Sequence, residues 1–236
     1  MIAHRGASGD APENTLAAFD LALAQGADAL ELDVRPAADG SLVTVHDPTL
    51  ARTTGDERAV EALTAAELRR LDHPAGPTTL DAVLARDGAT TRYFIDLKDP
   101  APAWEHRVLD AVERHDAAER VTLQSFDAGA LIRLHAAAPT LAYSTVYRRA
   151  DSVEIDLDAV PRFATAMAPW HPHVDADLVA RARARGLAVR PWSVDDAAEA
   201  ERLLALGVSG LFTNLPRVVV PAARRASRRC ASDLIQ

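Results

Sequence analysis

The sequence predicts a single α/β domain folded as a (β/α)₈ barrel, also called a TIM barrel. Short apolar runs alternate with amphipathic stretches along nearly the whole chain, which is typical of parallel strands joined by helices. The chain has 236 residues, a length that one such barrel commonly fills. No Gly-rich phosphate-binding loop follows the first expected strand, which disfavours an open, doubly wound sheet. We expect the barrel to occupy residues 1–220.

Nine runs have the length and apolar content of strands. They are residues 2–3, 29–35, 42–46, 93–97, 121–124, 141–144, 165–168, 188–192 and 210–213. Amphipathic spacing predicts helices at 15–25, 64–71, 79–86, 103–115, 127–137, 175–185 and 195–206. Asn14 or Thr15 suits the N-cap of the first helix, and Gly26, Gly186 and Gly207 follow helices at positions where glycine ends them. The alternation therefore extends from one end of the chain to the other.

The dipeptide Asp39-Gly40 accounts for the ninth strand. Asp-Gly between two apolar runs is a strong signal for a two-residue hairpin. The run 42–46 then pairs antiparallel with 29–35, which leaves eight parallel strands and a short insertion after the strand that ends in His46. If Asp39 and Gly40 are the two central turn residues, Asp33 lies opposite His46 on one face of the sheet. A slip of one residue would move His46 to the other face.

The composition is that of a globular protein, with 48% hydrophobic and 25% charged residues. The 34 acidic and 26 basic residues leave a net charge of −8, which disfavours nucleic-acid binding. The single cysteine, Cys230, cannot form an internal disulfide, and no apolar run approaches the roughly 18 residues of a membrane helix. We expect a cytoplasmic protein that is not inserted in a membrane.

Residues 221–236 are rich in arginine and predict a frayed basic tail, or alternatively a segment that docks on an acidic surface.

Acidic side chains lie on strands that are otherwise apolar. Glu31 and Asp33 are two residues apart, so both point to one face of their strand. Asp96 lies on the following strand. Buried carboxylates on one face repel each other unless a cation or a proton intervenes. Three carboxylates without cysteine favour a hard divalent cation, Mg²⁺ or Ca²⁺, with Mn²⁺ also acceptable, over zinc.

Cations and histidines are expected near these carboxylates, because they too lie at or just after the carboxyl ends of strands, which meet at one rim of a barrel. Lys98 shares a face with Asp96, and it is the only lysine among the 26 basic residues. Its compact ammonium suits an anion, as does the guanidinium of Arg5 after the first strand. A substrate that meets a metal and two cations is negatively charged, and phosphate fits. His4 and His46 have ordinary pKa values near neutrality, so they can act as general base and general acid in either order.

The motifs in which these residues lie resemble those of the glycerophosphodiester phosphodiesterase family, and they occur in the family's order along the chain. They are His4-Arg5-Gly6, Pro12-Glu13-Asn14-Thr15, Glu31-Leu32-Asp33, His46-Asp47, Ile95-Asp96-Leu97-Lys98, Ser125-Phe126, Pro191-Trp192-Ser193 and Thr213-Asn214-Leu215-Pro216. The resemblance implies a barrel of the PLC-like phosphodiesterase type. It also implies metal-dependent hydrolysis of a small glycerophosphodiester to glycerol 3-phosphate and an alcohol.

Residue by residue, the resemblance implies the following site. The acid–base pair is His4 and His46, the metal ligands are Glu31 and Asp33, the phosphate-binding residues are Arg5 and Lys98, and Trp192 lines the site or belongs to the core.

Asp96, our third ligand, stands where the family usually has glutamate, and its shorter side chain reaches less far. Asn214 stands where many members have aspartate, and we expect no catalytic consequence. Glu13 either anchors a helix entrance or helps to bind the metal, and Phe126 is expected in the core or on the face of a helix.

Two other functions remain open. One is a phospholipase D-like enzyme that acts on lysophospholipids or sphingolipids, which would need an apolar surface at the barrel mouth. The other is a metal-binding barrel without catalytic activity, which would be expected to lack a histidine or a ligand. The sequence leaves open the alcohol group of the substrate, the physiological metal and the oligomeric state. It also leaves open whether water or the glycerol 2-hydroxyl attacks the phosphate.

Overall fold

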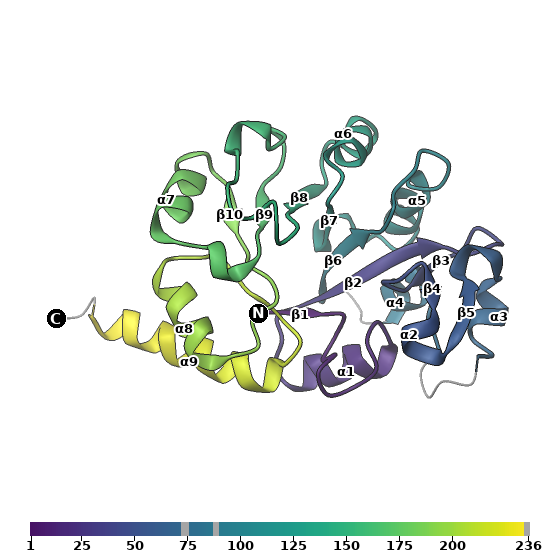
Figure 1. The fold of residues 1–236 in the computed structure, drawn as a ribbon, viewed down its shortest axis with the longest axis horizontal. Helices are drawn as coiled ribbons and strands as arrows, with labels where there is room; N and C mark the ends of the chain where they lie inside the picture. Colours follow the sequence, from purple (N-terminus) through teal and green to yellow (C-terminus); the bar gives the residue numbers. More distant parts are fainter. Residues whose placement is uncertain (72–75, 87–89, 234–236) are drawn as a thin grey trace.

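Eight parallel strands form the central sheet of the described chain. The computed structural model describes residues 1–71, 76–86 and 90–233 (Figure 1). The strands are β1 (Ile2–His4), β2 (Ala29–Pro36), β6 (Arg92–Leu97), β7 (Val121–Ser125), β8 (Ala142–Val146), β9 (Ala166–Ala168), β10 (Ala188–Val189) and β11 (Phe212–Thr213). They lie in the order β10-β9-β8-β7-β6-β2-β1-β11, and all of these neighbours are parallel.

The two ends of this sheet meet. The segment that contains β10 and the segment that contains β11 are joined by three backbone hydrogen bonds. Ser209 N donates to the Val189 carbonyl at 2.9 Å, Phe212 N to the Pro191 carbonyl at 2.9 Å, and Val194 N to the Phe212 carbonyl at 2.7 Å. These bonds complete the ring of strands, because they satisfy backbone groups that an open sheet would leave at its edges. The predicted (β/α)₈ barrel is confirmed.

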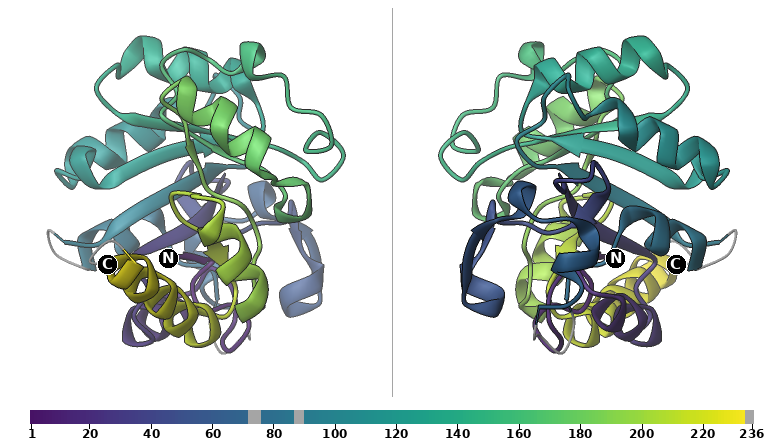
Figure 2. Two further views of the ribbon diagram at one scale, coloured as in Figure 1. Left: turned by 90° about the vertical axis from the view of Figure 1, so that its left-hand side faces the viewer. Right: turned by 90° about the vertical axis from the view of Figure 1, so that its right-hand side faces the viewer.

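Helices cover the outside of the barrel (Figure 2). They are α1 (Leu16–Ala24), α4 (Leu80–Arg86), α5 (His106–Arg114), α6 (Ala128–Ala137), α7 (Ala176–Ala184), α8 (Ala197–Ala205) and α9 (Pro216–Asp233). Side chains cap five of these helices by accepting hydrogen bonds from first-turn N–H groups: Thr15, Thr79, Asp127, Asp175 and Asp196. Between β8 and β9 the described connection contains only the short helix η3 (Leu157–Ala159). None of the helices in the described ranges has the length and hydropathy needed to cross a bilayer.

The expected insertion follows β3 (Leu42–Thr44) and forms a small unit at one side of the barrel (Figure 1). It contains β4 (Thr49–Leu50), α2 (Ala51–Thr54), β5 (Asp56–Ala59), η1 (Val60–Ala62) and α3 (Ala65–Leu68). Its apolar side chains form a cluster of their own with residues of β3, and the most buried members are Val43, Leu50, Val60 and Leu68. This cluster holds the chain that follows β3 against the barrel.

The hairpin between β2 and β3 differs from the expected register. Asp33 lies opposite Val45, whose N–H donates to the Asp33 carbonyl at 3.1 Å. The turn has three residues, 38–40, because Gly40 adopts a φ of +80° and its N–H donates to the Ala37 carbonyl at 2.9 Å. The prediction that strand pairing places Asp33 opposite His46 was therefore wrong. His46 lies in the loop after β3, and that loop returns it to the barrel.

The C-terminal segment also differs from the expected frayed tail. Helix α9 continues without interruption from Pro216 to Asp233, across the boundary expected at residue 220. Val219, Val220 and Ala222 are buried, and α9 packs against α8. Arg225 forms an ion pair with Glu201 at 3.2 Å. The alternation of buried apolar and exposed basic residues is that of an amphipathic helix, which was missed because the segment was interpreted from its four arginines and not from the spacing of its apolar residues.

Candidate active site

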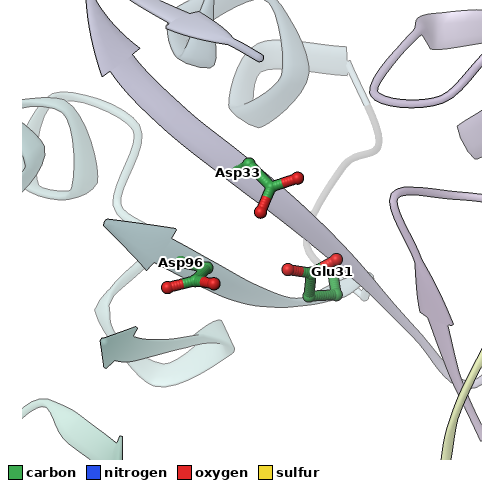
Figure 3. A group of neighbouring side chains, drawn as sticks. All are labelled: Glu31, Asp33 and Asp96. Atoms are coloured by element: carbon green, nitrogen blue, oxygen red, sulfur yellow. The ribbon is translucent and has the colours of Figure 1, made fainter. Parts of the chain in front are cut away.

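Three carboxylates meet on the adjacent parallel strands β2 and β6 (Figure 3). Glu31 and Asp33 point to one face of β2, and Asp33 and Asp96 are register partners on adjacent parallel strands. One oxygen from each side chain of Glu31, Asp33 and Asp96 lies within 4.8 Å of the other two. All three residues are buried. The structure therefore brings together the three acids that the period-two pattern singled out.

Burial and mutual repulsion shape the charges of this cluster. Burial raises the pKa of Glu31 well above its usual range, and the neighbouring Asp33 and Asp96 carboxylates raise it further. Burial also raises the pKa of Asp96 to about 6, against the opposing effect of Lys98. For Asp33 the burial effect is outweighed by Lys98 and Arg5, which hold its pKa well below the usual range. The cluster thus contains one firmly ionised carboxylate and two that resist ionisation without a cation.

The two predicted phosphate-binding cations contact these carboxylates directly. Lys98 Nζ lies 2.9 Å from Asp33 Oδ1 and donates to Asp96 Oδ2. Arg5 Nε lies 3.1 Å from Asp33 Oδ2, and the backbone N–H of Arg5 donates to Glu31 Oε2 at 2.8 Å. Both cations are therefore held within reach of anything that binds between the carboxylates.

Asn14 fixes the orientation of Asp33, a role that sequence reasoning missed. Its Nδ2 donates to Asp33 Oδ2 at 2.7 Å, and its Oδ1 accepts from the Asp33 backbone N–H at 3.1 Å. Asn14 has a φ of +58°, a conformation that asparagine tolerates better than most residues. The hydroxyl of Thr44 donates to the Asn14 carbonyl at 2.7 Å and holds this strained residue in place. Only the Pro-Glu-Asn-Thr motif in the sequence pointed to this position.

The donor set fits a hard divalent cation. Its three members offer carboxylate oxygens, and Asp96 Oδ1 is buried without a hydrogen-bond partner in the described chain. An unpartnered buried carboxylate oxygen is costly unless a cation binds it. Oxygen ligands are those that Mg²⁺ and Ca²⁺ prefer. Glu13 lies outside this cluster of carboxylates.

His4 ends β1, and its ring is oriented by a side-chain amide. His4 Nδ1 lies 2.7 Å from Asn214 Oδ1 and 3.2 Å from Ser193 Oγ. Asn214 Nδ2 donates to Asp195 Oδ2 at 2.7 Å, which turns Oδ1 of the amide toward the histidine. Because an amide oxygen only accepts, His4 Nδ1 carries the proton and Nε2 the lone pair. Burial lowers the pKa of His4 to about 4, and the positive charge of Arg5 adds to this effect.

Asn214 therefore has a clear contact with the candidate machinery, although we expected no consequence from an asparagine at this position. Its Oδ1 also accepts from the Ser8 hydroxyl at 2.9 Å. Asp195, in turn, accepts from the backbone N–H of Asn214 at 2.7 Å and from the Thr213 hydroxyl at 3.0 Å. The amide thus has a single possible orientation.

His46 is oriented by a carboxylate instead. Its Nδ1 lies 2.6 Å from Asp47 Oδ1, and the other oxygen of Asp47 accepts from Arg52 Nε at 2.6 Å. Arg52 also donates to both oxygens of Glu13, and Glu13 forms an ion pair with Arg5 at 3.0 Å. Burial lowers the pKa of His46, with Arg5 acting in the same direction, whereas Asp47 opposes the shift. This chain of ion pairs connects the insertion with the barrel rim.

An aromatic pair forms another part of the rim. Trp192 and Phe126 lie edge to face with ring centroids 6.5 Å apart, and both are half-buried. The indole N–H of Trp192 donates to the carbonyls of Ala168 at 3.0 Å and Tyr147 at 3.2 Å. Lys98 Nζ lies 5.2 Å from the centroid of Phe126. Phe126 packs against a core cluster of the barrel, and the expectation of a core or helix-face residue did not include its contact with Lys98.

A cavity of about 210 Å³ lies beside His46, between the loop after β1 and the insertion. Asn14, Asp47 and Arg52 are among the residues that line it, whereas the three clustered carboxylates are not. It is thus a neighbour of the carboxylate site, because Asn14 both lines the cavity and donates to Asp33.

Comparison with known proteins agrees with this geometry. Residues 4–218 match the sequence model of the Glycerophosphoryl diester phosphodiesterase family. The glycerophosphodiester phosphodiesterase of Caldanaerobacter subterraneus subsp. tengcongensis is 32% identical over 238 residues, covering 95% of this chain and 98% of its own. The corresponding Bacillus subtilis enzyme is 30% identical over 243 residues, covering 91% of this chain and 83% of its own.

Solved structures show the same relationship. A phosphodiesterase from Oleispira antarctica, in complex with the product sn-glycerol-3-phosphate, superposes with a TM-score of 0.85 at 26% identity, covering 94% of this chain and 96% of its own. A glycerophosphodiester phosphodiesterase from Agrobacterium tumefaciens superposes with a TM-score of 0.81 at 29% identity, covering 94% and 98%. With the family match spanning nearly all of the barrel, the chain belongs to the glycerophosphoryl diester phosphodiesterase family.

Proposed function

We propose that this enzyme uses a divalent metal ion and two histidines to hydrolyse a glycerophosphodiester to glycerol 3-phosphate and an alcohol. The observation that supports this best is the meeting of three buried carboxylates and two histidines, from separate parts of the chain, at one rim of the barrel. His4 is the register partner of Glu31 on the adjacent strand, and Asn14, which donates to Asp33, lines the same cavity as His46. The Oleispira relative holds sn-glycerol-3-phosphate, the product proposed here.

Glu31, Asp33 and Asp96 are the proposed metal ligands. A divalent cation such as Mg²⁺ or Ca²⁺ held by these carboxylates would supply neutralising charge and Lewis acidity to the phosphate. Arg5 and Lys98 flank the carboxylates and bind the remaining phosphate oxygens. Their positive charges also favour the ionised forms of the carboxylates, which is the form that a cation requires.

His4 is the proposed general base. Its Nδ1–H is engaged by Asn214, so Nε2 presents a lone pair, and a pKa of about 4 keeps the ring neutral at pH 7. His4 therefore accepts the proton of the attacking hydroxyl. That hydroxyl belongs either to water or to the glycerol C2 of the substrate.

His46 is the proposed general acid. The Asp47 carboxylate beside Nδ1 opposes the lowering of the His46 pKa by burial, so the cationic ring is less disfavoured here than at His4, whose partner is a neutral amide. His46 gives its proton from Nε2 to the oxygen of the departing alcohol. Trp192 and Phe126 form an apolar wall that excludes water from one side of the reacting phosphate.

The proposal is tested by assaying glycerophosphocholine with Mg²⁺, Ca²⁺ and Mn²⁺ and by detecting released glycerol 3-phosphate. We expect turnover with at least one metal and none in excess EDTA. A lysophospholipid assayed in parallel tests the phospholipase D-like alternative. Product formation that is unchanged in EDTA would refute the requirement for a divalent metal ion. The absence of product with every metal would support the alternative of a barrel without catalytic activity.

Two further proposals concern the whole chain. We propose that residues 1–220 form one catalytic domain, because all the side chains assigned above come from the barrel and its insertion, and that the rest of helix α9 is a structural extension of that domain. We also propose a cytoplasmic location, because a single cysteine is usual for proteins of a reducing compartment. A fusion to a fluorescent protein, expressed from the native gene, would show the location directly.

A further inference from the structure

Arg148 lies at the rim beside the proposed phosphate site. It follows β8, and its guanidinium carbon is 5.2 Å from the centroid of the Phe126 ring. Lys98 Nζ is 5.2 Å from the same centroid. The two cations are therefore no farther apart than twice that distance, and Lys98 in turn contacts Asp33 and Asp96.

The backbone of Arg148 is held by a buried hydroxyl. The Arg148 carbonyl accepts from the Ser152 backbone N–H at 3.0 Å and from the Ser152 hydroxyl at 2.9 Å. The same hydroxyl accepts from the Trp170 backbone N–H at 2.9 Å, and Ser152 is only 2% exposed. The side chain of Arg148 is exposed, so a preorganised backbone presents it to solvent at the mouth of the barrel.

The guanidinium of Arg148 has no carboxylate within ion-pair distance in the part of the chain that the structure describes. Other arginines of this rim differ: Arg35 pairs with Asp99 at 2.7 Å, and Arg52 pairs with Glu13 at 2.6 Å. A guanidinium that stacks on a ring still offers its N–H edge, and that edge binds oxyanions with directional hydrogen bonds. Arg148 is thus a positioned cation with unused donors.

The same contacts disfavour a cationic group at this position. Aromatic rings bind quaternary ammonium groups through their faces, but the Phe126 ring is already approached by two cations. A third positive charge would be repelled by both. An anionic group would instead be attracted by both, and it would meet the guanidinium edge.

We propose that Arg148 contacts the alcohol portion of the substrate and selects glycerophosphodiesters whose alcohol carries a negative charge, such as a second phosphate, over those whose alcohol carries a quaternary ammonium. This inference rests on the proposed hydrolysis of glycerophosphodiesters. The inference adds to that proposed function the charge of the alcohol portion that the enzyme prefers.

The test uses three substrates that differ in the charge of the alcohol portion. They are glycerophosphocholine (positive), glycerophosphoglycerol (neutral) and bis(glycerophospho)glycerol (negative). For the unmodified enzyme we expect kcat/KM to rise in that order, with a ratio of about 10 or more between the last and the first at low ionic strength. The ratio should shrink as salt is added, because Arg148 is exposed and its charge is screened.

Variants at Arg148 test whether this residue causes the preference for the negatively charged substrate. Arg148→Gln should lower the ratio by about 5-fold, and Arg148→Glu, which reverses the charge, by about 30-fold. The change should arise mainly in KM for the negative substrate, because Arg148 is remote from the bond that breaks. Arg148→Lys should keep most of the preference. The matched control is Arg181→Gln, which removes the same charge from helix α7, where Arg181 pairs with Asp177.

The possible outcomes are distinct. Equal kcat/KM values for the three substrates, a preference for choline, or Arg148 variants that behave like Arg181→Gln would each overturn the inference and leave the proposed function standing. The alcohol would then occupy another place, such as the cavity beside His46. If none of the three diesters is hydrolysed with any metal, the proposed function fails, and the inference fails with it.

Discussion

The side-chain amide of Asn214 donates to Asp195 at 2.7 Å, and this bond decides which atom of Asn214 faces His4. Asp195 accepts only, so the amide nitrogen is committed to it and the amide oxygen faces the imidazole. The partner of His4 is thus neutral, whereas the partner of His46 is the Asp47 carboxylate. Two histidines of one site are held by chemically different groups, and this difference separates their proposed roles.

Removing the amide should misplace His4. We expect Asn214→Leu to lower kcat by about 100-fold, because a small displacement of a catalytic base is sufficient for such a loss. Asn214→Asp should raise the pKa of His4, because a carboxylate stabilises the cationic ring. Since the base must be neutral to act, the acid limb of the pH–rate profile then moves to higher pH. Ser8→Ala is the control, because it leaves the bond to Asp195 intact, and an unshifted acid limb in Asn214→Asp would contradict the assignment.

The two histidines should each be required for turnover. His4→Ala and His46→Ala are expected to lower kcat by about 100- to 10,000-fold, the usual contribution of a positioned acid or base. Thermal melting of both variants should resemble that of the unmodified enzyme. His115→Ala, a change far from the rim in helix α5's C-cap, serves as the control. A folded variant of His4 or His46 that keeps normal turnover would remove that residue from the mechanism.

A divalent cation should stabilise the folded protein through the carboxylate cluster. At a concentration 100 times its dissociation constant, Ca²⁺ or Mg²⁺ should add about 2.7 kcal/mol to the free energy of unfolding. Glu31→Gln should abolish this gain, since it removes one ionised ligand. Glu61→Gln, an exposed substitution in the insertion, should leave the gain unchanged. Thermal melts with and without EDTA measure both, and an equal gain in Glu31→Gln would place the metal elsewhere.

Metal affinity should depend on pH in a defined direction. The pKa of Glu31 is raised by burial and by its acidic neighbours, and that of Asp96 is raised to about 6. Below these values protons compete with the cation for the same oxygens, so the apparent affinity should weaken as the pH falls through 6 and strengthen as it rises. Titration calorimetry with Ca²⁺ at pH 5 and pH 7.5 measures this. An affinity that is equal at the two values would be inconsistent with ligation by these carboxylates.

The reach of residue 96 is open to a direct test. Asp96→Glu should retain or exceed the activity of the unmodified enzyme if this side chain ligates the cation, because the added methylene extends the carboxylate toward the site. Asp96→Asn should lose metal binding, since it removes the charge and keeps the size. A properly folded but inactive Asp96→Glu would show that the residue is more than a simple ligand.

Local rules were sufficient for part of the candidate site. Side chains alternate along a strand, so Glu31 and Asp33 share a face, as do Asp96 and Lys98, whatever the rest of the chain does. Parallel strands in a barrel share one carboxyl-terminal rim, which placed His4 and Arg5 near these acids. The hairpin register failed because one residue of turn length, set by the conformation of Gly40, moves every later pair.

Other contacts had no local signal. His4 and Asn214 are joined across 210 positions of sequence. Arg148 and Lys98 meet at Phe126 only because β6, β7 and β8 are neighbours in the sheet. The end of helix α9 was taken for a tail because four arginines lie close together after residue 220, yet α9 packs against α8.

The amino-acid sequence by itself determined the barrel, the three acids and the family, because strand periodicity and ordered motifs are properties of short segments. Only the tertiary structure decided which partner each histidine has, how Asp33 is held by Asn14, and where Arg148 stands. These depend on the closure of the sheet and on loop conformation, which bring distant segments within hydrogen-bond distance and which short-range patterns do not encode.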